Sequence, residues 1–130
     1  MGNIFCNENN EIQSISLKYY IDKYIENFDN LINVSNLYNE KLKSNRNIYD
    51  NINQQYNNMT DLRFKLGDAF IKENDSFFEL LLESKKNENI HELLNKYKEI
   101  RTNMLKYGFE NFISARETQN YIEILRNLHI

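Results

Sequence analysis

The sequence predicts a mainly α protein: an antiparallel two-helix coiled coil joined by one β-hairpin, with a short C-terminal helix after it. Apolar residues recur at the coiled-coil period through the first half of the chain, and a second such run fills much of the last third. Between them lies a short segment in which apolar and charged residues alternate. The 130 residues include no proline, which suits long helices because proline breaks them.

The first helix is predicted over residues 11–57, after a disordered polar leader at residues 1–10. Thirteen positions follow one another at alternating spacings of four and three residues, and eleven of them are apolar. This average spacing keeps one narrow seam facing a partner helix. The positions are Leu17, Ile21, Tyr24, Phe28, Leu31, Ser35, Tyr38, Leu42, Asn45, Tyr49, Ile52, Tyr56 and Met59.

The hairpin is predicted over residues 61–72. Leu62 to Leu66 alternate strictly, which is the signature of a strand, and Gly67-Asp68 suits a two-residue type II′ turn. A lone two-stranded hairpin is marginally stable and leaves both edges open, so we expect hairpins from several chains to assemble. The expected oligomerisation residues are Leu62, Phe64, Leu66, Gly67, Asp68, Phe70 and Ile71.

The second helix is predicted over residues 77–107, with Ser76 and Glu79 forming a capping box at its start. An apolar block at residues 77–82 is out of phase with the seam that follows, which predicts a phase slip near residues 85–88. The tail at residues 114–130 is expected to be partly helical and to lie opposite residues 17–25. The seam after the slip comprises Ile90, Leu93, Tyr97, Ile100, Met104 and Tyr107.

The sequence predicts no enzyme, cofactor or metal site. The two histidines lie far apart, no Cys/His metal spacing occurs, and the three glycines are isolated, so no phosphate-binding loop is present. A net charge of −3 without a basic run argues against nucleic-acid binding. Cys6 is the only cysteine, no window of 18 apolar residues could span a membrane, and no secretory signal is seen, so a cytoplasmic protein is expected.

The segment Phe64 to Ile71, FKLGDAFI, resembles the hairpin of β-type prefoldin subunits, which carry an aromatic-x-apolar-Gly pattern before an apolar strand. The nearest form within that family is the one in subunit 4. The segment from Leu105 to Phe109 resembles the end of the second helix in the same subunit, and the resemblance covers residues 11–113.

This resemblance implies a subunit of a hetero-hexamer, with two α-type and four β-type subunits, that holds unfolded proteins without ATP. It implies actin- and tubulin-like clients, which pass to the cytosolic chaperonin. Clients would be captured at the coiled-coil tip, since loosely packed apolar surfaces can adapt to many partners. The tip candidates are Leu17, Tyr20, Ile21, Tyr24, Ile25, Tyr121, Ile122 and Leu125, for which ordinary packing between the first helix and the tail is the alternative.

Two other functions stay open at this point. Gly2 and Cys6 partly match an N-terminal lipidation signal, which would make the protein a membrane-tethered coiled-coil adaptor. The chain could also be a structural coiled-coil subunit of another complex, an alternative that the predicted hairpin argues against, since a plain coiled coil has no use for it.

Overall fold

The computed structural model describes residues 2–46 and 52–129, and the side chains of residues 17–44 and 59–129. Its described part is helical and contains no strand. The elements are α1 (Gly2–Arg46), α2 (Ile52–Glu83), a 3₁₀ turn η1 (Ser84–Lys86), α3 (Glu88–Leu105), α4 (Phe109–Ser114) and α5 (Arg116–Arg126). The prediction of a mainly α protein with long helices packed against each other is confirmed.

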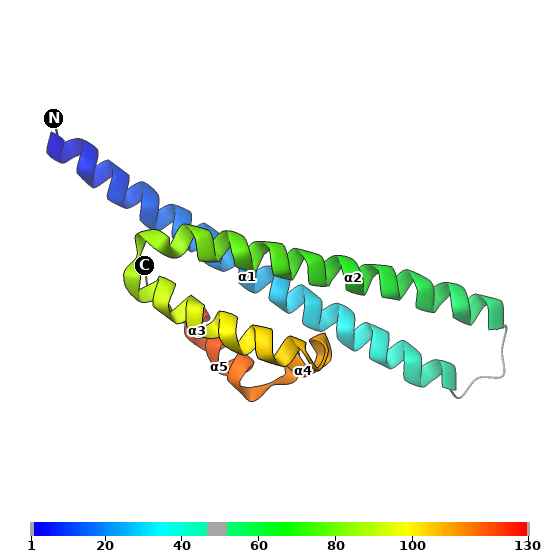
Figure 1. The fold of residues 1–130 in the computed structure, drawn as a ribbon. Helices are drawn as coiled ribbons and strands as arrows, with labels where there is room; N and C mark the ends of the chain where they lie inside the picture. The colour runs from blue at the N-terminus through cyan, green and yellow to red at the C-terminus, as the bar shows by residue number, and fades with distance from the viewer. Residues whose placement is uncertain (1, 47–51, 130) are drawn as a thin grey trace.

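The two long helices α1 and α2 lie side by side and antiparallel (Figure 1). On α1 the predicted seam is buried from Leu17 to Ser35. The matching row on α2 repeats at the same four-and-three spacing and is buried except for the half-buried Leu62. That row comprises Met59, Leu62, Leu66, Ala69, Glu73, Ser76 and Leu80.

The predicted bounds of the first helix were wrong at both ends. Residues 2–10 are helical rather than a disordered leader, since no proline or internal glycine between residues 3 and 16 stops the helix. At the other end α1 stops at Arg46, and Ile52 already belongs to α2. The second long helix therefore begins earlier than predicted, and Met59 packs as part of α2.

The predicted β-hairpin was also wrong, because residues 61–72 lie inside α2. The alternation of Leu62, Phe64 and Leu66 is too short to separate a strand from a helix, and burial against α1 decides the outcome. Leu66 is 8% exposed in the helix row, whereas Phe64 is 74% exposed on another side of α2. Asp68 and Lys72 form an ion pair of 3.0 Å at the four-residue spacing that a helix brings together.

The reversal between α2 and α3 falls where the phase slip was predicted. The predicted capping box is absent, because Ser76 lies within α2 and its hydroxyl donates to the Lys72 carbonyl oxygen at 2.8 Å. The break comes at η1, and Asn87 caps α3 by accepting from the Ile90 backbone N–H at 3.2 Å. The single predicted helix over 77–107 is thus divided between α2 and α3.

The C-terminal elements fold back on the first half of the chain. Gly108 adopts a φ of 105°, a region that favours glycine, and connects α3 to α4. α5 contacts both α1 and α3, and the side chain of Arg126 is paired with Asp29 of α1 at 2.5 Å. The predicted C-terminal helix corresponds to α5.

The helices α3 to α5 cover only part of the α1–α2 pair (Figure 1). At that end α1 to α5 all contribute to a core whose largest fully buried side chains are aromatic, including Phe28, Phe77 and Phe112. At the other end, the parts of α1 and α2 that lead to Arg46 and Ile52 project beyond α4 as a pair of helices. We call this pair, residues 36–46 with residues 52–66, the arm.

Candidate functional site

The predicted client-binding tip lies in the core. Five of its eight residues are at most 5% exposed, and Tyr20, Ile25 and Tyr121 are partly buried against the same cluster. Tyr121 stacks on Tyr97 with ring centroids 5.7 Å apart. These side chains join α1 to α5 and are unavailable to a client in this structure, so the alternative of ordinary packing explains them. The five are Leu17, Ile21, Tyr24, Ile122 and Leu125.

A polar network in the middle of this helical core was not predicted. The Glu73 carboxylate of α2 is fully buried and accepts two hydrogen bonds from the Arg101 guanidinium of α3, one of them from Nε at 3.1 Å. The Tyr24 hydroxyl of α1 donates to Glu73 Oε2 at 2.8 Å. Its oxygen also lies 2.5 Å from the Tyr97 hydroxyl of α3. Three helices therefore meet at one carboxylate.

Aromatic rings enclose the buried cation. The Arg101 Cζ atom lies 5.0 Å from the ring centroid of Phe77 and 5.4 Å from that of Phe112. Burial by itself would lower the pKa of Arg101, but its hydrogen bond and ion pair with Glu73 outweigh burial, and the net direction is upward. Arg101 is thus held as a cation with its charge neutralised by Glu73.

The two tyrosines of the network resist ionisation. Burial raises the pKa of Tyr24 well above its usual range, and the nearby Tyr97 and Glu73 add to the shift. Burial also raises the pKa of Tyr97, more than its hydrogen bond with Tyr24 and the charge of Arg101 lower it. Neither hydroxyl can serve as a base near neutral pH, so the network links helices rather than transferring protons.

The sequence did carry a signal for this network. Glu73 occupies a row position on α2 between Ala69 and Ser76, and Arg101 continues the buried α3 row after Tyr97. A charged residue at such a position is costly unless a partner meets it, so two of opposite sign on different helices indicate a pair. The hairpin prediction leaves Glu73 between the two predicted helices, so the sequence analysis does not identify it as a position of a helix row.

A largely apolar hollow lies where the arm joins the rest of the molecule. It has a volume of about 440 Å³ and is formed by α1, α2 and α4. Arg63 and Glu110 add opposite charges to an otherwise mainly apolar lining. The helical residue Gly67 leaves it open, since a Cβ atom built there meets nothing within 4 Å. The lining residues are Tyr38, Arg63, Leu66, Gly67, Phe70, Phe109 and Glu110; we call this hollow the arm groove.

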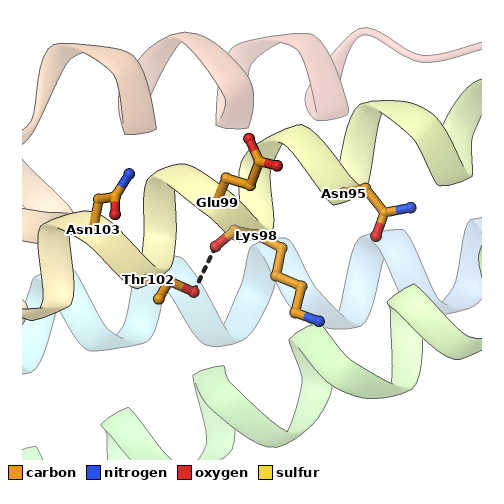
Figure 2. Close-up of a pocket in the computed structure, with 5 residues that line it drawn as sticks. All are labelled: Asn95, Lys98, Glu99, Thr102 and Asn103. Atoms are coloured by element: carbon orange, nitrogen blue, oxygen red, sulfur yellow. Dashed lines mark hydrogen bonds between the residues drawn. The ribbon is translucent and has the colours of Figure 1, made fainter.

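A larger, polar hollow of about 580 Å³ lies along the outer side of α3 (Figure 2). Lys98 extends toward α2, whereas Glu99 and Asn103 lie on the side of α5. The hydrogen bond drawn there, from Thr102 Oγ1 to the Lys98 carbonyl oxygen at 2.9 Å, stays within the helix. These side chains diverge from one helix, so they do not form a site that surrounds a ligand.

The part of the chain that the structure describes also has no group of three or more His, Cys, Asp or Glu side chains placed to hold a metal ion. Within the same residues, no helix has an apolar stretch long enough to cross a membrane. The side chain of Cys6 lies outside the described ones and nothing here tests acylation of Gly2, so lipidation at either residue stays a prediction. No protein-family model, curated protein or solved structure matches the chain.

Proposed function

We propose that this protein binds other polypeptides without catalysis and that the arm groove receives their apolar side chains. The observation that carries the proposal is the groove itself, which is largely apolar and open to solvent at Gly67. Phe70 and Phe109, whose ring centroids are 6.3 Å apart, supply an aromatic wall contributed by α2 and α4. Arg63 and Glu110 offer charges of both signs to the polar groups of a bound chain.

In a finer form of this proposal, the protein resembles prefoldin in function. It holds unfolded actin- or tubulin-like chains for the cytosolic chaperonin. In this form the arm groove takes the place of the coiled-coil tip as the client site, and the protein acts in the cytoplasm. Its support is the resemblance of residues 64–71. Joining a hexamer through a β-barrel would require those residues to leave α2. Native purification with mass spectrometry tests this form, which requires five other small coiled-coil subunits to be recovered with the chain.

The arm groove can be tested by filling it at Gly67. Glycine in the interior of a helix lowers the helix's stability by roughly 0.5–1 kcal/mol relative to alanine. Gly67→Leu should therefore stabilise α2 while the new side chain occupies the groove. Gly67→Ala is the matched control, because it gives a similar helix stabilisation and leaves most of the groove open.

The assay is suppression of light scattering by reduced, aggregating insulin. We expect wild type and Gly67→Ala to suppress scattering equally, and Gly67→Leu to require at least about fivefold more protein. Equal suppression by all three proteins would locate the activity elsewhere. Absence of suppression by the wild type, together with absence of any co-purified polypeptide, would reject the proposed function.

A further inference from the structure

The outer side of α2 carries a second row of residues at the coiled-coil spacing. Each position lies two residues after a position of the row that faces α1, which is a rotation of about 200° around the helix. The outer row therefore points away from α1. It comprises Phe64, Asp68, Ile71, Asp75, Phe78 and Leu82.

The apolar members of this outer row are exposed to solvent. Phe64 is 74% exposed, Ile71 57%, Phe78 44% and Leu82 64%. They are the only large apolar side chains of α2 with that degree of exposure among residues 59–83. Four apolar side chains on one straight row, with the same period as the buried row, indicate that a second helix packs there.

We propose that the partner is a second copy of this chain, whose α2 packs antiparallel against the first with the dimer axis near residue 73. In this register Phe64 packs against Leu82 of the second copy. Each of the next layers toward the axis pairs a carboxylate with an apolar residue. Asp68 faces Phe78 of the second copy, and Asp75 faces Ile71 of the second copy. Each copy therefore contributes the same six positions to the interface, as a two-fold axis requires.

The charges on the outer row support this orientation. A parallel pair would place Asp68 against Asp68 and Asp75 against Asp75, so like charges would meet in an apolar layer. In the antiparallel pair, Asp68 approaches Phe78 of the second copy, beside which Lys98 lies with its Nζ 6.0 Å from the ring centroid. Asp75 approaches Ile71 of the second copy, next to Lys72. A lysine of the other chain thus lies near each row carboxylate, and Lys72 is at the same time paired at 3.0 Å with Asp68 of its own chain.

The exposed area of the outer row approaches that of a small dimer interface. At about 200 Å² for a whole phenylalanine side chain, the exposed parts of the four apolar residues amount to roughly 400 Å² per copy. Two copies bury roughly 800 Å² from these residues alone, and the stems of flanking lysines such as Lys65 and Lys72 bring the total toward the 1,200 Å² of a small stable interface. None of the outer-row residues lines the arm groove, so the dimer does not depend on the proposed function.

Two substitutions with opposite expected effects test the dimer by sedimentation equilibrium. The wild type should sediment with twice the chain mass of 15.7 kDa. Ile71→Glu, on an exposed side chain, should raise the dimer dissociation constant at least 100-fold with unchanged helicity. Asp75→Leu should lower the same constant about tenfold, because it replaces a carboxylate in an apolar layer. A wild type that is monomeric at 100 μM, or an Ile71→Glu protein that dimerises normally, would overturn the proposal.

Disulfide cross-linking tests the orientation in a Cys6→Ser background. Phe64→Cys and Leu82→Cys chains, when mixed, should form a covalent heterodimer. Phe64→Cys alone should not cross-link, since the two copies of residue 64 would lie about 27 Å apart along the helices. Rapid cross-linking of Phe64→Cys with itself would show a parallel pair and refute the register.

Discussion

Replacing Arg101 by methionine should be far more damaging than any surface substitution in this protein. The change keeps most of the apolar stem but removes two hydrogen bonds to Glu73, including the one from Nε at 3.1 Å, and leaves that carboxylate with the Tyr24 hydroxyl at 2.8 Å as its remaining donor. Breaking a buried pair from one side costs about 3–5 kcal/mol, because the other charge stays buried without compensation. The contacts of the guanidinium with Phe77 and Phe112 are lost as well.

Urea unfolding followed by circular dichroism at 222 nm measures this loss. With a slope of about 2 kcal/mol per molar urea, a loss of about 4 kcal/mol lowers the unfolding midpoint by about 2 M. Arg126→Met is the matched control, because its 2.5 Å pair with Asp29 joins two side chains that are 40% and 43% exposed. That variant should lose less than about 1 kcal/mol.

The double variant Glu73→Leu/Arg101→Met completes the cycle. Removing both charges leaves no uncompensated ion, so its free energy of unfolding should lie within about 1 kcal/mol of the wild-type value or above it. The reasoning fails if Arg101→Met costs no more than Arg126→Met. It also fails if the double variant loses as much free energy of unfolding as the single variants Glu73→Leu and Arg101→Met lose together. That result would mean that the two residues are not coupled.

Three further predictions follow from buried and terminal groups. Thr118→Val should raise the free energy of unfolding by about 1 kcal/mol in the same urea assay, because the Thr118 hydroxyl is fully buried without a hydrogen-bond partner; no gain would contradict this. In absorbance titration at 295 nm, Tyr24 and Tyr97 should stay protonated until the protein unfolds. Because folding raises the pKa of both, the stability they contribute is complete below about pH 10 and falls above it, and Tyr97→Phe should weaken that fall. If Gly2 and Cys6 are lipidated, the intact mass of protein from its native source will exceed the polypeptide mass; an unmodified N-terminus excludes the anchor.

The sequence was sufficient to predict the helical class and the row of α1 that packs against α2. Apolar residues at regular spacing over several turns, from Leu17 to Leu31, fit only one periodicity, and all of that row is buried. The prediction failed where the pattern was short. Leu62, Phe64 and Leu66 fit a strand of five residues, but two of the three also fit the helix row that continues to Ala69. Whether these residues form a strand or a helix depends on the element against which they pack. That element is α1, which is distant in sequence.

The chain reversals show the same dependence on context. Gly67-Asp68 suggests a turn when read locally, yet a solvent-exposed glycine is tolerated in a long helix that gains its stability from packing. The two long helices are instead separated between Arg46 and Ile52, and residues 47–51 lie outside the described part of the chain. A hairpin predicted at residues 61–72 puts the reversal too late in the chain, and it places the candidate tip on side chains that form the core.

The buried network also explains how two long helices find one alignment. Regular apolar rows pack almost equally well when one helix slides by a heptad, so they fix the register weakly. A slide of seven residues would move Glu73 from Tyr24 to either Leu17 or Leu31, which offer no donor to a carboxylate. Arg101 lies on α3, which follows α2 after a short turn, so the Glu73–Arg101 pair stays intact and the slide loses the hydrogen bond from the Tyr24 hydroxyl to Glu73, worth about 1.5–3 kcal/mol for a charged acceptor. The double variant Glu73→Leu/Arg101→Met should therefore remain stable but no longer favour one register of α1 against α2. Broadened amide resonances of α2 in its NMR spectrum would reveal this loss.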